Sequence, residues 1–305
     1  MTVKPLRIGM IGTDNSRIVH FAKYMNDESD PWHVPGARLV AAWPGEPSPD
    51  FPMSVGRIGG YTATLRDRYG VAIEESIDAV AGQCDAWMLE AVDGRVRETL
   101  FARMLPYRKP IFIDKPFALS TVAAASMIRQ AKALGTSFMS CSALRYADAL
   151  TRALSEGDEI SGADFYGPLL LEPTQEEYFW YGIHAAEMLF RALGPDCDSV
   201  RALRTDDHDV VVGVWNDGRI GTIRGNRTGN ETFGGALHRT KGTTGMQVAE
   251  TDKPFLASLT EAALAFFRGE GGIDPRETLA IVRFLEAANE SLREGRTVRL
   301  SHAAL

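Results

Sequence analysis

The stretch LRIGMIGTDNSR, residues 6–17, decides the fold of this chain. Its first half, Leu6–Ile11, is a short apolar run of the kind that forms a strand buried on both faces. A turn follows at residues 12–16, and apolar side chains then recur at helical spacing over residues 18–25. A buried strand that leads through a tight turn into a helix is the first part of a βαβ unit.

Strands and helices continue to alternate through the first half of the chain. The patterns predict strands over residues 38–43, 86–89, 110–113 and 137–140, and helices over residues 63–69, 96–104 and 121–134. Strands separated by helices of this length imply a parallel sheet, so we expect a Rossmann-type nucleotide-binding domain over residues 1–144. The segment 44–60 is dense in Pro and Gly and predicts a long loop.

The second half of the chain has a different pattern. Strands are expected over residues 210–215, 218–224 and 246–249, and amphipathic helices over residues 254–268 and 275–294. The sequence Asn216-Asp217-Gly218 is a strong hairpin turn. Antiparallel strands with helices on one face predict an α+β domain with a mostly antiparallel sheet over residues 145–305, so the whole chain is expected to be α/β.

The composition is that of an ordinary globular protein, with 45% hydrophobic and 24% charged residues, and the length of 305 residues favours two domains over one. A net charge of −7 gives no general attraction to phosphate backbones or anionic membranes, so we expect no nucleic-acid and no membrane partner. The three cysteines are far apart, which argues against a disulfide framework or a metal site. Because no apolar leader pattern is present, we expect a cytoplasmic protein.

A dinucleotide-binding fold carries G-x-G-x-x-G after its first strand, and this chain has only the first glycine, Gly12. Asp14 stands at the second glycine and puts a carboxylate where a diphosphate would rest, while Arg17 could partly offset that charge. The second strand also ends without the acidic residue that usually holds the adenosine ribose. Two interpretations stay open: a modified dinucleotide site, or an ordinary turn in which Asp14 or Ser16 caps the next helix.

The sequence Asp114-Lys115-Pro116 follows a predicted buried strand, at the sheet edge where ligands bind in open α/β folds. Partial burial would lower the pKa of Lys115 and suit the amine to proton transfer or to polarising a hydroxyl group. The alternative is a surface lysine that precedes a turn.

His184 lies at the start of a predicted helix, with Glu187 one turn later on the same face. A carboxylate so placed could fix the tautomer of the imidazole and raise its basicity; a solvated His–Glu pair is the alternative. Tyr178 and Tyr181 lie just before the histidine and suit the apolar face of a sugar, although core packing explains them as well. Arg145 is a candidate for binding an anionic or hydroxyl-rich substrate, or for a structural ion pair.

Together, the turn at residue 12, the Lys–Pro sequence at residue 115 and the helix-borne histidine at residue 184 resemble the Gfo/Idh/MocA family, which includes glucose–fructose oxidoreductase and inositol dehydrogenase. The resemblance extends over essentially the whole chain and includes the closing segments FLEAANES, residues 284–291, and GRTVRL, residues 295–300. The altered dinucleotide loop marks this chain as a divergent branch.

The resemblance implies a Rossmann domain followed by a substrate-binding domain whose sheet mediates homo-oligomerisation, as a dimer or a tetramer. It implies NAD(P)-dependent hydride transfer with a sugar, a cyclitol or a related polyol. Lys115 would contact the nicotinamide ribose and the substrate hydroxyl, and His184, with Glu187, would take the hydroxyl proton. The residues expected at the cofactor, NAD or NADP, are Gly12, Thr13, Asp14, Asn15, Ser16, Arg17, Glu90, Asp93, Lys115 and Pro116. The residues expected at the substrate are Arg145, Tyr178 and Tyr181.

Three places depart from the family's pattern: the loop, Trp180 in place of an aspartate, and residues 90–97 in place of A-T-P-x-x-x-H. Carboxylates at the ends of the predicted parallel strands, Asp14, Glu90 and Asp93, could bind a cation or a polyol, or pair with arginines. These departures keep two other classes of function open. One is a lyase, hydratase or isomerase that works without a dinucleotide, and the other is a catalytically silent ligand-binding protein.

Overall fold

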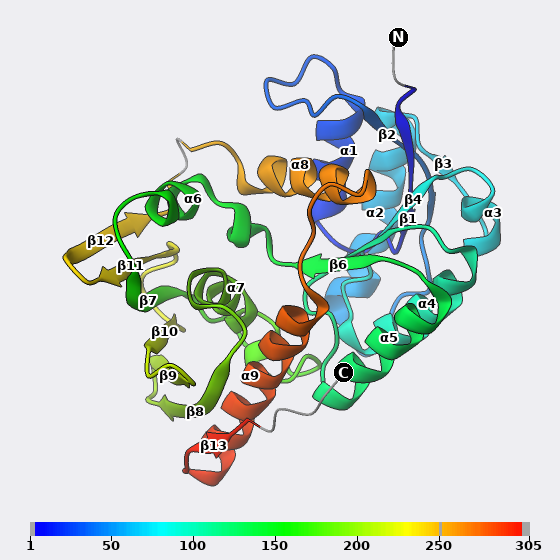
Figure 1. Ribbon diagram of the computed structural model, residues 1–305. Helices are drawn as coiled ribbons and strands as arrows, with labels where there is room; N and C mark the ends of the chain where they lie inside the picture. The colour runs from blue at the N-terminus through cyan, green and yellow to red at the C-terminus, as the bar shows by residue number, and fades with distance from the viewer. Residues whose placement is uncertain (1–3, 250–251, 301–305) are drawn as a thin grey trace. The chain divides into compact units, whose positions relative to one another are not determined.

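The computed structural model describes residues 4–249 and 252–300, and their contacts divide the chain into two units (Figure 1). The first unit holds the residues up to 118 together with 126–140 and 256–273. The second unit holds residues 119–125 and 141–255 and those from 274 onward. None of the helices in the described part of the chain combines the length and the apolar character that a membrane span needs.

A six-stranded parallel sheet organises the first unit. Its strands are β1 (Leu6–Ile11), β2 (Ala37–Trp43), β3 (Ala72–Ile73), β4 (Ala86–Leu89), β5 (Ile111–Asp114) and β6 (Phe138–Cys141). They lie in the order β3-β2-β1-β4-β5-β6, and the pairs from β3 to β5 run parallel. The predicted Rossmann sheet is confirmed. Because the strand order reverses between β1 and β4, the carboxyl ends of these two strands mark the place where such folds bind ligands.

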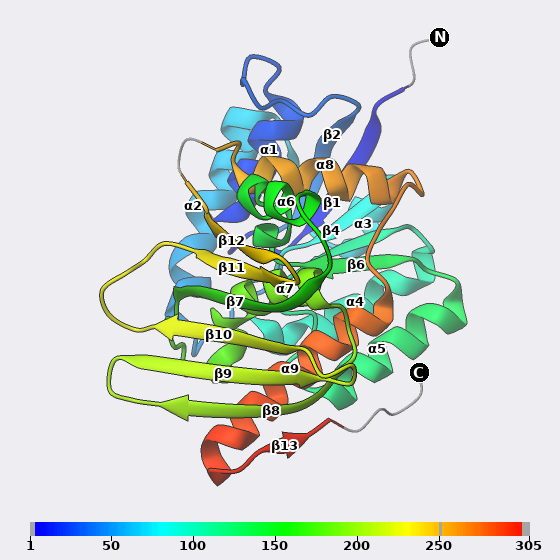
Figure 2. The same cartoon turned by 60° about the vertical axis from the view of Figure 1, so that its left-hand side comes forward.

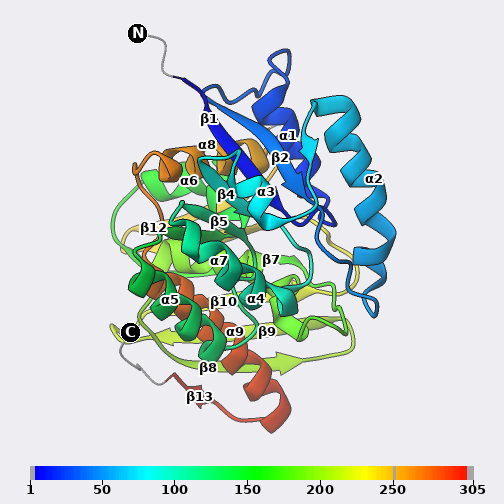
Figure 3. The same ribbon diagram turned by 90° about the vertical axis from the view of Figure 1, so that its right-hand side faces the viewer.

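Both faces of this sheet are covered, because successive side chains of a strand point to opposite faces and every residue of β4 and β5 is buried. The helices and 3-10 turns of the first unit are α1 (Arg17–Asn26), α2 (Pro52–Tyr69), α3 (Ile77–Ala81), η1 (Gly94–Val96), α4 (Arg97–Met104), η2 (Leu105–Tyr107) and, from its second residue, α8 (Phe255–Phe267). Helix α5 (Thr121–Leu134) is shared between the units, with the division after residue 125. Helix α1 packs against β2 and against α2 (Figure 3).

The predicted loop over residues 44–60 is wrong from Pro52 onward, where α2 begins. Pro52 lies in the first turn, where a missing N–H costs nothing, and the fully buried Phe51 precedes it. Three exposed glycines make this segment look irregular in sequence, and a side chain added at any of them would meet open space: Gly56, Gly59 and Gly60. Packing of the helix in the folded unit therefore overrides their low helix propensity.

A seven-stranded mixed sheet organises the second unit. Its strands are β7 (Ile160–Pro168), β8 (Cys197–Arg204), β9 (His208–Trp215), β10 (Ile220–Asn226), β11 (Gly234–Arg239), β12 (Gly242–Gln247) and β13 (Val298–Arg299). The order is β12-β11-β7-β10-β9-β8-β13, and β7 with β10 is the parallel pair among antiparallel ones. The prediction of a mostly antiparallel sheet in an α/β chain is confirmed. None of the expected strands corresponds to β7, β8, β11 or β13, and the strand expected at residues 246–249 lies earlier, as β12.

One face of this second sheet is covered by helices and the other is open (Figure 2). Helix α7 (Gly182–Leu193) packs on β7 and β10, and α9 (Pro275–Glu294) packs on β8. The unit also contains η3 (Ala143–Tyr146), α6 (Asp148–Ser155) and η4 (Glu177–Phe179). Along β9 the buried residues alternate with more exposed ones, which is the pattern of a strand that has helices on one side.

Helix α8 follows the second unit in sequence but packs with the first from residue 256 onward. Arg268, just after the helix, donates from Nη2 to the carbonyl oxygen of Gly36 at 3.1 Å, directly before β2. A contact between residues so far apart in sequence leaves no local signal in the chain. The domain boundary at residue 144 stays a prediction.

Candidate functional site

Gly12 ends β1 and brings the turn against the segment that follows β4. Its φ of +89° is a conformation that side chains rarely adopt, and an added Cβ would lie 2.4 Å from the backbone nitrogen of Ala91. Two further bonds hold the turn to the end of β2: the N–H of Gly12 donates to the carbonyl of Trp43, and that of Thr13 donates to Pro44. The first position of the loop therefore requires glycine.

Asp14, at the usual second glycine, is a buried structural anion. Its carboxylate accepts the backbone N–H of Val92 at 2.8 Å and the hydroxyl of Ser54 at 2.5 Å. The first donor follows β4 and the second lies in α2, so one side chain ties three segments of the first unit together. The charge that seems misplaced in sequence is satisfied by donors from the protein itself.

Neither Asp14 nor Ser16 caps helix α1 with its side chain, so the capping part of the ordinary-turn interpretation is wrong. Ser16 occupies the N-cap position without a side-chain bond, and the side-chain oxygen of Asn15 accepts the N–H of Arg17 at 3.1 Å instead. The amide nitrogen of Asn15 donates to Asp114 at 2.9 Å and to Glu90 at 3.3 Å. The loop thereby reaches the ends of both β4 and β5.

An arginine pair continues this network along the carboxyl edge of the sheet. Arg17 forms an ion pair with Asp114 at 2.5 Å. Arg97 is fully buried and donates to the carbonyl oxygens of Ala91 at 2.8 Å and Asp114 at 2.6 Å. Glu90, one of the carboxylates predicted at this edge, is thus connected to Asp114 through the side chain of Asn15.

Burial and neighbouring charges shift the pKa values of this cluster in opposite directions. Burial and the charge of Asp114 raise the pKa of Glu90 well above its usual value. Burial opposes the charge on Asp114, but Arg17 and Arg97 outweigh it and hold the pKa of Asp114 below its usual value. Burial and the charges of Arg17 and Arg97 lower the pKa of Lys115 well below its usual value, against the pull of Asp114. Lys115 is buried, so the surface-lysine alternative is wrong.

Asp93 has different partners from Glu90 and fastens the segment 44–54 that follows β2. Asp93 accepts the hydroxyl of Ser48 at 2.6 Å and pairs with Arg95 at 2.8 Å. Arg95 also pairs with Asp50 at 2.7 Å. With the Ser54–Asp14 bond, these contacts hold residues 44–54 against the turns after β1 and β4.

A cavity of about 290 Å³ opens beneath this segment, at the carboxyl ends of β1, β2 and β4. Its walls are Gly12, Asp14, Trp43, Pro44, Gly45, Glu46, Ser48, Ala91, Arg95, Val96, Thr99, Leu100 and Arg103. The guanidinium of Arg103 lies 5.3 Å from the ring centre of Trp43. Sequence reasoning misses Trp43, Thr99 and Arg103. Trp43 could have been predicted from its position, because it ends β2 and ligands of open α/β sheets bind at the carboxyl ends of the strands.

In the second unit, His184 lies in the first turn of α7 with its Nδ1 atom 2.5 Å from Ser142 Oγ. Ser142 follows β6, and its N–H donates to Glu187 at 3.1 Å. The rings of Tyr181 and Phe233 meet the imidazole edge-on, at centroid distances of 5.4 and 5.7 Å. Because His184 and Glu187 are both buried, the solvated-pair alternative is wrong. Ser142 is the partner of His184 that sequence reasoning misses.

Arg145 lies against two carboxylates of this cluster. It pairs with Glu187 at 3.4 Å and with Glu277 of α9 at 2.5 Å. Burial raises the pKa of Glu187 to about 7, although Arg145 and the N–H of Ser142 favour its charged form. Whether Arg145 also contacts a substrate stays a prediction.

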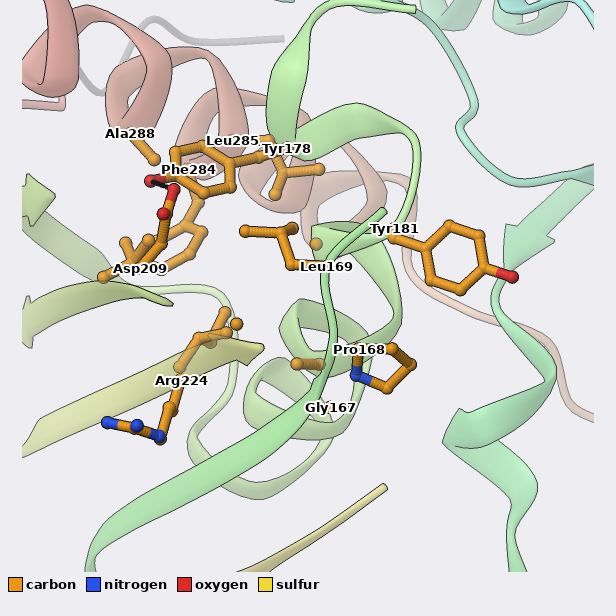
Figure 4. A pocket seen from close by; sticks show the side chains of 15 residues that line it. Gly167, Pro168, Leu169, Tyr178, Tyr181, Asp209, Arg224, Phe284, Leu285 and Ala288 are labelled. Carbon is orange, nitrogen blue, oxygen red and sulfur yellow. Dashed lines mark hydrogen bonds between the residues drawn. The ribbon is translucent and has the colours of Figure 1, made fainter. Parts of the chain in front are cut away.

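The two predicted substrate tyrosines lie in different surroundings. The hydroxyl of Tyr178 is buried and bonds to Asp209 at 2.8 Å, beside a void of about 10 Å³ between the second sheet and its helices. Such a void has roughly the space of one water molecule. In Figure 4 the ring of Tyr181 points away from the centre of this void, and it lies beside His184. Both substrate assignments stay predictions, and the bond to Asp209 gives Tyr178 a structural role.

Among the residues that the structure describes, no group of three or more His, Cys, Asp or Glu side chains is arranged to hold a metal ion. The four carboxylates at the sheet edge bond to arginines, an asparagine, serines and backbone N–H groups: Asp14, Glu90, Asp93 and Asp114. This arrangement does not support the cation that the sequence left open.

The residues of the first unit fit a dinucleotide, the cofactor that the resemblance implies. At Gly12 the backbone of the turn lies against Ala91, where the strand order of the sheet reverses. The walls of the cavity there include the ring of Trp43 and the guanidinium groups of Arg95 and Arg103. The carboxylate of Asp14 keeps its charge, but its oxygens are bonded within the protein, to Val92 and Ser54.

No protein-family model matches the sequence, and no curated protein matches it. Solved structures do match. GenD2 from gentamicin A biosynthesis, in complex with NAD, is 18% identical with a TM-score of 0.77, and the match covers 99% of this chain and 98% of that one. The apo scyllo-inositol dehydrogenase of Lactobacillus casei is 15% identical, with a TM-score of 0.78 and coverages of 98% and 99%. An oxidoreductase from Agrobacterium radiobacter, in complex with NAD+, L-tartaric acid and magnesium, is 17% identical, with a TM-score of 0.72 and coverages of 97% and 99%. These similarities confirm the predicted fold over nearly the whole chain.

Proposed function

We propose that this protein is an NAD(P)-dependent oxidoreductase that transfers a hydride between a nicotinamide cofactor and a sugar, a cyclitol or a related polyol. The observation that carries the proposal is the cavity of about 290 Å³ at the reversal point of the parallel sheet, next to the glycine turn. The similar structures include a complex with NAD and a scyllo-inositol dehydrogenase, and these support the classes of cofactor and substrate.

The proposal gives the first unit the task of holding the cofactor. The turn at residues 12–16 precedes helix α1, whose N-terminal N–H groups favour a diphosphate. Trp43 and Arg103 would bind the adenosine end in the cavity. When bound, the cofactor supplies the hydride acceptor or donor. Lys115, whose pKa is lowered by burial and by Arg17, would contact the nicotinamide ribose and the substrate hydroxyl.

The proposal gives the second unit the task of binding the polyol. The cluster of His184, Glu187 and Arg145 provides donors and acceptors for hydroxyl groups, and the ring of Tyr181 offers an apolar face beside them. His184 is the residue proposed to exchange the proton of the reacting hydroxyl.

One observation favours a non-redox enzyme as the second candidate. Asp14 and Arg17 replace two loop glycines, and the Arg17–Asp114 ion pair lies along the edge that a dinucleotide would follow. A lyase, hydratase or isomerase on this scaffold would turn over its substrate without any change in added nucleotide.

Calorimetric titration with NAD(H) and NADP(H) tests the proposal, after the absorbance of the purified protein has been checked for retained nucleotide. We expect micromolar binding of at least one form, or retained cofactor, in the range usual for enzyme ligands. A folded sample that retains no nucleotide and binds none up to about 1 mM overturns the oxidoreductase and favours the second candidate.

Two tryptophan substitutions on α4 show whether such binding occurs in the cavity. Thr99 lines the cavity and Glu98 does not, and both are exposed on the helix. Thr99→Trp fills the cavity, so we expect nucleotide affinity to fall at least about tenfold, whereas Glu98→Trp leaves it unchanged. Equal affinity in both variants would place the nucleotide elsewhere.

A further inference from the structure

The hydroxyl group of Ser142 has two polar neighbours in the described part of the chain. Oγ accepts the backbone N–H of Leu144 at 3.2 Å, as the cap of η3, and it lies 2.5 Å from Nδ1 of His184. The side chain of Ser142 is fully buried, so water does not offer a third partner.

The direction of the Ser142–His184 bond follows from counting protons and lone pairs. A hydroxyl has one proton to donate and two lone pairs, and one lone pair is taken by Leu144. If Nδ1 of His184 carried the proton, the proton of Ser142 would have no acceptor among the described residues. A buried donor without an acceptor costs free energy, so the hydroxyl donates to Nδ1.

Ser142 is held in place by groups on either side. Its N–H donates to Glu187 at 3.1 Å, and Glu187 in turn pairs with Arg145. The imidazole is held edge-on by Tyr181 and Phe233, which limits rotation of its ring. The serine and the ring therefore keep one arrangement.

We propose that Ser142 is a positioning residue that holds the neutral imidazole of His184 as the Nε2–H tautomer, so that Nε2 offers a hydrogen-bond donor to an oxygen of the bound substrate. A neutral imidazole in this form polarises a substrate oxygen as a donor. The base role that the resemblance implies for His184 requires the other tautomer, in which Nδ1 carries the proton and Nε2 carries the lone pair. The substrate part of this inference rests on the proposed function, while the tautomer does not.

Nuclear magnetic resonance of the whole protein, labelled with ¹⁵N in its six histidines, reads the tautomer directly. Long-range proton–nitrogen correlations distinguish a protonated Nε2 from a protonated Nδ1, and a His184→Gln spectrum assigns the signals. We expect the Nε2–H pattern at neutral to mildly basic pH, without nucleotide or substrate. An Nδ1–H pattern for His184, or an even mixture of the two tautomers, overturns the proposal.

Variants at Ser142 separate positioning from packing. Ser142→Ala removes the hydroxyl, so we expect the tautomer preference of His184 to weaken, and Ser142→Thr keeps the hydroxyl and restores it. An unchanged pattern in a folded Ser142→Ala variant contradicts the proposal. Because this readout needs no cofactor, a failed nucleotide titration would overturn the proposed function and leave the tautomer assignment standing.

Discussion

The carboxyl group of Glu187 is buried in the second unit, where it accepts one N–H bond from Ser142 and faces Arg145 at 3.4 Å. Burial raises its pKa from an ordinary 4.5 to about 7, because one distant guanidinium and one N–H do not replace full hydration. Between these two pH values the folded protein keeps a proton that the unfolded chain releases. The stability from this group is complete below about pH 4.5 and is lost as the pH rises to about 7.

Glu187→Gln should remove this pH dependence, because glutamine does not titrate yet still offers an oxygen to the N–H of Ser142. We expect the difference in unfolding free energy, wild type minus variant, to fall by up to about 1.4 kcal/mol per pH unit between pH 5 and pH 7. Urea unfolding at several pH values measures it. The exposed Glu98→Gln is the control and should follow the wild type. Parallel curves for wild type and Glu187→Gln would show that the pKa of Glu187 is not raised in the folded protein.

Single residues show why the site could be predicted only in part. Gly12, Lys115 and His184 were found because each stands at a fixed offset from a strand or helix that has a clear pattern. The partners were not found, because they are tertiary. Ser142 meets His184 from 42 residues away in the chain, and Ser54 meets Asp14 from 40 residues away. Asp14 therefore looks unfavourable in sequence and is well satisfied in the fold.

At the scale of elements, glycine has opposite roles in the turn after β1 and in helix α2. At Gly12 the backbone is left-handed and an added Cβ would collide with Ala91. At Gly59 the backbone is helical and the position of an added Cβ is open. Gly59→Ala should therefore stabilise the protein by about 0.5–1 kcal/mol, by restricting the unfolded chain and favouring the helix.

Gly12→Ala is the contrasting variant and should destabilise the protein by about 3 kcal/mol or more, from backbone strain together with overpacking. Thermal and urea unfolding of both variants beside the wild type measure the two effects. A loss of stability in Gly59→Ala would mean that α2 does not form over its glycines in solution.

The elements that could be predicted are those in which the pattern of apolar residues matches the burial of the element in the fold. The strands of the first sheet are short apolar runs because both of their faces are buried. Strand β8 alternates buried residues with charged ones such as Arg201 and Asp198, so its apolar signal is half as dense and the sequence analysis misses it. The first half of helix α2 was not predicted for a different reason. Its glycines are typical of a loop, and the helix forms there because it packs in the folded unit.

At the scale of the molecule, the open face of the second sheet exposes large apolar side chains. Leu203 of β8 is 56% exposed and Ile220 of β10 is 52% exposed. Val214 lies opposite Ile220, and Val210 lies opposite Leu203, so the apolar side chains form adjacent pairs on one face. Large exposed apolar side chains grouped on one face are typical of an interface between proteins. It supports the predicted homo-oligomer, with a second copy covering this face.

Charge on this face should therefore prevent assembly without unfolding the chain. We expect light scattering after size exclusion to show a dimer or a tetramer for the wild type at tens of micromolar, and a smaller species for Ile220→Glu combined with Leu203→Glu. Val122→Glu on α5 is the matched control, since Val122 is 78% exposed and lies away from this sheet in sequence, and it should assemble like the wild type. A wild type that stays monomeric, or a double variant that assembles unchanged, would mean that this face does not join two copies. In an assembled wild type, the exposed pairs of β8, β9 and β10 would become buried, which accounts for apolar residues on a face that no helix of the second unit covers.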